Sequence, residues 1–161
     1  QGRRIKVNRT VLDPKIEAPK LIKKYGKSLG HSIIATTKLE QNYKGYNNNY
    51  GGFDITSGGW RFNPKLHEGY IVLREGGTKL CKAFIAFKNY EAFVEQIVQS
   101  FKSKGFDKVT NAEEYSKVWY EKWNGHGART RPDLAKLSKE EADKKALAEA
   151  RSAWNSTNNF V

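Results

Sequence analysis

The chain has 161 residues, of which 38% are hydrophobic and 29% are charged, and its formal net charge at pH 7 is +12. This length suits one domain with its own core, and the composition is that of a soluble globular protein. The charge predicts attraction to a polyanion, such as nucleic acid, an anionic membrane surface or the bacterial wall. No segment has membrane-spanning length, and the single cysteine, Cys81, excludes an internal disulfide.

The first segment, residues 1–18, is predicted to be an N-terminal arm or linker on the surface. Its apolar periodicity is weak, and the Asp13-Pro14 pair and Pro19 are typical of irregular segments. A helix is expected from Pro19, with Gly30 as its stop. The apolar residues with helical spacing in this segment are Leu21, Ile22, Tyr25 and Leu29.

The next segment, from His31 to Asn42, is predicted to be a helix, although its β-branched residues would also suit a strand. On a helix, Ile33, Thr37 and Glu40 share one face. Glu40 then points where buried residues point, which is costly for a carboxylate unless it is paired, neutral or catalytic. Two interpretations follow: a core helix with an acid at its rim, or a catalytic acid.

Residues 43–60 are dense in Gly, Asn and aromatic residues, which predicts an irregular loop because Gly and Asn tolerate positive φ angles. Aromatic rings can cover the apolar faces of sugars, while amides bond the hydroxyl groups. The loop therefore suits carbohydrate; the alternative is that its rings fold inward as a small core. The candidate substrate-binding residues of this loop are Tyr43, Asn48, Asn49, Tyr50, Phe53 and Trp60.

A β-hairpin is predicted over residues 69–87, because two β-rich runs flank Gly76-Gly77. After Asn89 the period changes to three and four residues, which predicts an amphipathic helix that ends near Gly105.

Two further helical regions are expected towards the end of the chain. The first spans residues 111–125, with Asn111 and Glu114 as a capping pair. The tail from Pro132 is predicted to contain two short helical pieces, the second capped by Ser138. The narrow, Ala-rich apolar face of this tail suits a helix docked on the domain or one that binds a partner.

Several kinds of chemistry find little support in the sequence. Cys81 has no companion, no Gly-x-Ser-x-Gly nucleophile motif occurs, and neither common phosphate-binding glycine motif is present. We therefore expect no metal, no cofactor and no nucleotide. The three histidines lie too far apart in sequence for a metal motif: His31, His67 and His126.

Carboxylate chemistry remains, because cleavage of a glycosidic bond needs one acid to protonate the leaving oxygen and a carboxylate, water or substrate group on the other face. Glu40 is the candidate acid, and burial beside Ile33 and Tyr43 would raise its pKa. The candidates for the second acidic group are Asp54, Glu68 and Glu75.

The order of these motifs resembles that of the lysozyme-like glucosaminidases, a family of bacterial and phage peptidoglycan hydrolases. The resemblance covers roughly residues 19–125. It rests on Ala35 followed by Glu40, on Asn-Asn-Tyr-Gly-Gly-Phe at 48–53, on the hairpin exit at 84–93, and on the Asn-Ala-Glu-Glu-Tyr-Ser-Lys helix start at 111–117.

The chain departs from the family pattern in two places. Gln41 stands where Ser is common, and the expected Tyr-Ala-Thr-Asp segment is missing. Tyr115, Tyr120 and Trp123 are the candidates to replace its substrate-facing aromatic residue. The Trp-Asn-Gly at 123–125 is also similar to the Tyr-Asn-Gly of some phage muramidases, so the bond that is cut stays open.

The resemblance implies an α+β, mainly α structure: a lysozyme-like helical domain with a small β-hairpin lobe. The expected organisation is an arm over 1–18, a catalytic domain over 19–130 and a helical tail over 131–161. The resemblance further implies a peptidoglycan glycosidase with Glu40 as acid and with Tyr115 and Trp123 at the substrate. Its partners would be glycan strands and other phage virion or tail proteins, and it would act outside the cytoplasm.

Three alternatives stay open. A lytic transglycosylase would use the same single Glu as acid and then as base. A basic binding module would stack its aromatics on bases and neutralise phosphates with its lysines. A structural component of a tail or secretion machine would have kept the fold and lost the activity.

Overall fold

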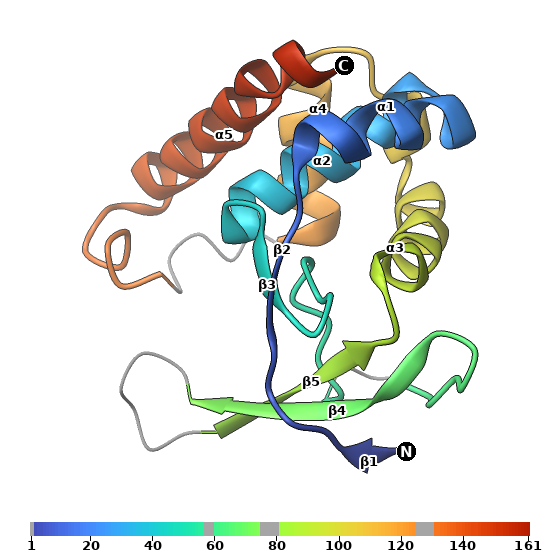
Figure 1. The fold of residues 1–161 in the computed structure, drawn as a ribbon. Coiled ribbons are helices and arrows are strands. Elements are labelled where there is room, and N and C mark those ends of the chain that lie inside the picture. The colour runs from blue at the N-terminus through green and yellow to red at the C-terminus, as the bar shows by residue number, and fades with distance from the viewer. Residues whose placement is uncertain (1, 57–59, 75–80, 125–130) are drawn as a thin grey trace. The chain divides into compact units, whose positions relative to one another are not determined.

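The protein is α+β and mainly helical in the computed structural model (Figure 1). The chain divides into two compact units, each made of two separate stretches. The sheet unit comprises residues 1–13 and 40–98, and the helical unit comprises residues 14–39 and 99–161. The structure describes residues 2–56, 60–74, 81–124 and 131–161.

The sheet unit is built on the predicted hairpin. Strand β4 (His67–Arg74) pairs antiparallel with β5 (Cys81–Phe87), and β1 (Arg3–Arg4) pairs parallel with the other edge of β4 (Figure 1). The hairpin is thus confirmed, whereas its turn at 76–77 lies outside the described residues. A bulge interrupts the β4–β5 register between His67 and Gly69.

The segment expected to be an arm contributes strands to this unit. Strand β2 (Arg9–Val11) pairs antiparallel with β3 (Lys44–Tyr46). The Asn47 side chain fixes the segment: its Oδ1 accepts from Asn8 N at 2.8 Å and its Nδ2 donates to Lys6 O at 3.1 Å. The amide bonds backbone groups that would otherwise lack a strand partner. The segment is therefore ordered by hydrogen bonds to Asn47, which its own weak apolar periodicity does not reveal.

The helical unit begins with α1 (Pro14–Tyr25) and α2 (Lys27–Gln41). The predicted helix over 31–42 is confirmed as the main part of α2. The expected stop at Gly30 is wrong, because the break falls at Gly26, which has a φ angle of 93°. Gly30 lies inside α2, where an added Cβ would come within 2.9 Å of the Ile22 backbone nitrogen. Gly30 therefore permits two helices to approach closely.

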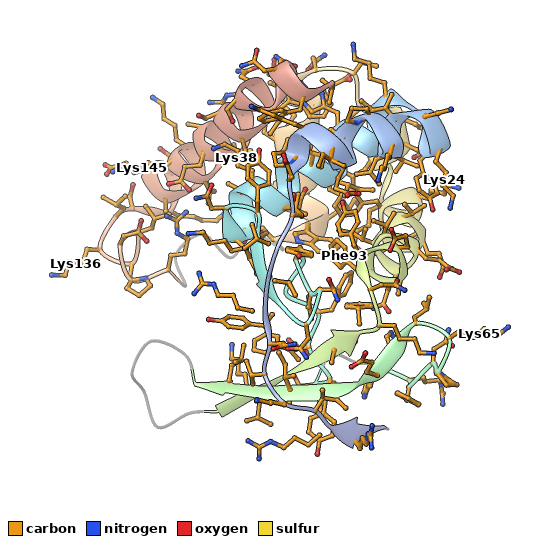
Figure 2. The ribbon with its side chains drawn as sticks, viewed as in Figure 1. Lys24, Lys38, Lys65, Phe93, Lys136 and Lys145 are labelled. Atoms are coloured by element: carbon orange, nitrogen blue, oxygen red, sulfur yellow. The ribbon has the colours of Figure 1, made fainter. Side chains whose placement is uncertain are left out.

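Helix α3 (Tyr90–Lys104) confirms the amphipathic helix predicted after Asn89. Phe93 of α3, labelled in Figure 2, is fully buried. Its ring centroid lies 5.5 Å from that of Tyr50. The other buried apolar residues of α3 are Ala92, Val94, Ile97, Val98 and Phe101.

The next helical region is split into a short 3₁₀ turn η1 (Phe106–Lys108), α4 (Ala112–Val118) and a π-helix η2 (Trp119–Trp123). The predicted cap is confirmed, because the Asn111 side chain accepts from Glu114 N at 2.9 Å. The Glu114 carboxylate returns to Thr110 N and Oγ1, both at 2.8 Å, which shifts the second half of the capping box by one residue.

The tail forms one long helix, α5 (Lys139–Ser156), followed by η4 (Asn158–Phe160). Ser138 caps it as predicted, accepting from Glu141 N at 3.2 Å. The first of the two expected helical pieces is a pair of turns instead, over residues 131–137. Helix α5 packs against α4 through a face of small residues. The buried residues of α5 are Ala142, Ala146, Ala150, Ala153 and Trp154.

His31 joins α2 to the end of α5. Its ring stacks on Trp154 with centroids 3.5 Å apart, and its Nε2 lies 2.9 Å from Trp154 O and 3.0 Å from Thr157 Oγ1. Because a carbonyl only accepts, Nε2 carries the proton and Nδ1 does not. Nδ1 is buried without a hydrogen-bond partner in the part of the chain that the structure describes. Burial lowers the pKa of His31.

This histidine predicts a loss of stability in mild acid. Its folded-state pKa lies below the unfolded value of 6.5, so its contribution is present above pH 6.5 and is lost as the pH falls through the folded pKa. We expect the free energy of unfolding, measured with urea, to fall between pH 7.5 and pH 5.

His67 contributes in the same direction, because burial lowers its pKa as well. The variant His31→Gln should therefore be less stable at pH 7.5 and show a flatter pH dependence, to which His67 still contributes. A variant with the full wild-type slope would contradict the role given to His31.

Candidate functional site

The carboxylate of Glu40 lies in the last turn of α2. The residues of its predicted face, Ile33 and Thr37, are buried, but burial decreases along the last turn and Glu40 is exposed. The expectation that Glu40 is buried beside Ile33 and Tyr43 is therefore corrected: α2 runs beyond the packed part of its own face.

Directly after Glu40, Gln41 lines a pocket of about 240 Å³ that lies entirely within the sheet unit. The half-buried Gln41 side chain makes no hydrogen bond in the part of the chain that the structure describes. Its amide is therefore available to a ligand. The residues that line the pocket are Gln41, Tyr46, Asn49, Gly52, Ile71, Leu73 and Phe84.

The pocket is mostly apolar because of the strand register. Ile71 and Leu73 lie two residues apart on β4 and so face the same side of the sheet, and Phe84 on β5 pairs directly with Ile71. Tyr46, at the end of β3, adds a second ring. Apolar and aromatic walls with few polar groups are typical of sites for small organic ligands.

Asn49 forms part of the pocket wall, but its amide is engaged in the fold. The side chain is 4% exposed, and its Nδ2 donates to Phe53 O at 2.8 Å and to Ile85 O at 3.0 Å. Its Oδ1 accepts from Phe53 N at 3.1 Å and from Gly51 N at 3.4 Å. The expected substrate amide is thus a structural one, which ties the loop to β5.

Asn48 differs from Asn49 in role. Its backbone N–H donates to Thr10 Oγ1 at 3.1 Å, and its φ angle is 60°. Asn tolerates this left-handed conformation better than most residues, so the backbone explains this residue and no side-chain contact is needed.

The aromatic residues predicted from the loop do not line the pocket. Tyr50 is a core residue, 2% exposed. Phe53 is half-buried with its ring against Phe87 and Phe93. The alternative of a small aromatic core therefore describes these rings.

The two remaining candidate aromatics of the loop, Tyr43 and Trp60, are half-buried. Trp60 lies with its ring centroid 5.0 Å from that of His67. Burial raises the pKa of Tyr43 to about 12, so this phenol is neutral at physiological pH.

The candidate aromatics of the later helix belong to the helical unit. Tyr115 is fully buried, and its hydroxyl shares a 2.7 Å hydrogen bond with Thr36 Oγ1. Tyr120 is buried and donates to the Asp143 carboxylate. The proposed substrate role of Tyr115 is corrected to a core role, while Trp123 is half-buried with its ring against Phe101.

The other candidate acids occupy different local settings. Asp54 accepts from Thr56 N at 3.0 Å and Thr56 Oγ1 at 2.8 Å, which forms a local turn. Glu68 is exposed, at the bulge of β4 rather than before the hairpin. Glu75 lies outside the described residues.

Within the described ranges, no group of three His, Cys, Asp or Glu side chains could hold a metal ion. No helix in those ranges combines the length and the apolar character needed to cross a membrane. Comparison of the chain with known protein families, with curated proteins and with solved structures finds no match. The functional argument therefore rests on the residues themselves.

Sequence reasoning missed most of the pocket lining. Ile71, Leu73 and Phe84 carry a detectable signal, because alternate residues of a predicted hairpin share a face. Gln41 and Tyr46 carry no such signal, since their approach to the sheet depends on the loop conformation. Asn47, which orders the N-terminal segment, was indistinguishable from its two Asn neighbours.

The asparagine pair provides a test of these roles. Asn49→Ala removes four hydrogen bonds to backbone groups, of which Phe53 O keeps a second donor, Ile85 N at 3.0 Å; the free energy of unfolding should fall by about 2 to 4 kcal/mol. Urea denaturation followed by tryptophan fluorescence would measure it.

Asn48→Gly is the matched control. It retains the backbone N–H and the positive φ angle, so we expect a change within about 0.5 kcal/mol. Equal losses in the two variants would show that the Asn49 amide has no special structural role.

Proposed function

We propose that this protein is a glycosidase that cleaves the glycan of the bacterial cell wall outside the cytoplasm, with Glu40 as general acid. The observation that carries the proposal is the position of Glu40: an exposed carboxylate in the last turn of α2, directly followed by a residue that lines a pocket. The resemblance of the motif order to peptidoglycan glucosaminidases supports the same assignment.

The chemistry of the pocket suits a sugar with an apolar substituent. Tyr46 and Phe84 can cover the apolar faces of a ring, and the amide of Gln41 can bond a hydroxyl or acetamido group. The net charge of +12 favours adsorption to an anionic wall.

In the proposed reaction, Glu40 protonates the glycosidic oxygen as the bond to the anomeric carbon breaks. A bound glycan would exclude water from the exposed carboxyl, and this desolvation favours the protonated acid. Asp54, Glu68 or the acetamido group of the sugar would act on the opposite face. Water then completes hydrolysis, whereas attack by the sugar's own hydroxyl would give the anhydro product of a transglycosylase.

The alternative of a nucleic-acid binding module has less support. Single strands bind through bases that stack on accessible rings. Every Phe, Tyr and Trp of the chain falls in the described residues, and each is buried or half-buried. The binding module would therefore depend on half-buried rings, as the glycosidase does, and the resemblance of the motif order is what favours the glycosidase.

The substitution Glu40→Gln tests the proposal. It removes the proton donor while keeping the shape, so the rate of wall cleavage should fall by about 100- to 10,000-fold, in line with loss of a general acid. Loss of turbidity of a purified wall suspension would measure the rate, and mass analysis of the fragments would identify the bond.

The control is Glu95→Gln, which makes the same carboxylate-to-amide change at an exposed position on α3. We expect wild-type cleavage and unchanged stability. An unchanged rate in Glu40→Gln, or intact walls after treatment with the wild-type protein, would refute the proposed function.

A further inference from the structure

The N-terminal segment carries a row of cations that the proposed catalysis does not use. Residues 2–12 contain four basic residues and no acidic one. Together with Lys44 on the neighbouring strand, they form what is here named the basic strip. Its members, all exposed, are Arg3, Arg4, Lys6, Arg9 and Lys44.

The basic strip is held in place by the backbone of its own residues. Lys6 O accepts from the Asn47 amide, Ile5 N donates to Tyr70 O at 2.7 Å, and β1 and β2 pair with β4 and β3. The cations therefore project from an ordered segment. A fixed array of charges loses less entropy on binding an anion than a flexible tail does.

The charges of the basic strip are not neutralised internally. In the part of the chain that the structure describes, none of its five side chains forms an ion pair or hydrogen bond with another residue. By contrast, Arg131 in the helical unit is paired with Asp133 and Glu149. Unpaired, ordered cations are a ready site for an external anion.

Two members of the strip lie next to the pocket. In the β2–β3 register Arg9 is opposite Tyr46 and Val11 is opposite Lys44, so Arg9 and Lys44 project from the same face of this ribbon as Tyr46. The Arg9 guanidinium lies 5.8 Å from the centre of the Tyr46 ring, and Tyr46 lines the pocket. A ligand at Tyr46 would therefore lie beside Arg9, with Lys44 two residues away on the same face of the ribbon.

We propose that Arg9 and Lys44 form an anion subsite that binds a carboxylate or phosphate group carried by the same polymer whose sugar occupies the pocket. This inference rests on the proposed function for the identity of the sugar polymer. Arg9 presents a planar fork that suits either group, and Lys44 adds a second charge. Arg9 also covers one face of Tyr46, which favours an anion at this position over a stacked base.

The test compares two double variants that each remove two positive charges. Arg9→Gln/Lys44→Gln changes the proposed subsite, whereas Lys136→Gln/Lys145→Gln changes two exposed lysines of the helical unit, of which Lys136 extends away from the ribbon in Figure 2. Co-sedimentation with purified walls, in the Glu40→Gln background and at several salt concentrations, measures binding without cleavage.

We expect the subsite variant to bind walls about tenfold more weakly, with a flatter salt dependence, because two exposed charge contacts are lost. The control variant should lose less than about twofold, since its charges act only through the screened long-range field. Walls stripped of phosphate polymers with hydrofluoric acid separate the two sources: a loss on both preparations indicates a carboxylate, and a loss on native walls alone indicates a phosphate.

Equal losses in both double variants, no loss in either, or no wall binding at all would overturn the subsite. So would a subsite variant that loses binding to single-stranded DNA while binding walls normally. Cleavage by the wild-type protein is scored separately: walls that are bound through Arg9 and Lys44 but never cut would leave the subsite standing and refute the glycosidase.

Discussion

The sheet unit depends on side-chain amides that replace backbone pairing. Asn47 bonds Lys6 and Asn8 in the N-terminal segment, and its backbone carbonyl accepts from Phe87 N at 2.9 Å. Asn49 bonds the loop and β5. Short strands leave many backbone groups unpaired, and a buried unpaired group costs about 1 to 3 kcal/mol. Two amides, one residue apart along the chain, remove several of these costs, and one of them, Asn49, is part of the pocket wall.

This constraint changes how the asparagine run is understood. Asn48 and Asn49 were predicted to bind a ligand, but the amide of Asn49, like that of Asn47, is buried and directed into the fold. What remains for a ligand is the neighbouring chemistry: one unengaged amide at Gln41, two rings and the cations of the basic strip. The site is thus less polar, and more basic at its edge, than the composition of the loop indicates.

The helices and strands were predictable because they follow from the spacing of apolar residues and from helix-capping side chains. Alternation and a Gly-Gly turn predicted the hairpin, spacing of three and four predicted α3, and Asn111 and Ser138 were recognised as caps. The sequence left the burial of Glu40 open between a rim position and a buried one, because the residues of a helical face do not show where the packing partner of that face ends. Gly30 shows the same limit: glycine serves equally as a stop and as a point of close approach.

The two compact units alternate along the chain: residues 1–13 and 40–98 form the sheet unit, and residues 14–39 and 99–161 form the helical unit. Neither unit is a contiguous fragment. During synthesis α1 and α2 leave the ribosome well before α4 and α5, so the buried face that carries His31 has no Trp154 to cover it until the last segment is made. Completion of the helical unit therefore comes late and needs a contact between residues far apart in the sequence. Until α5 is made, the apolar face of α2 around His31 lacks this cover.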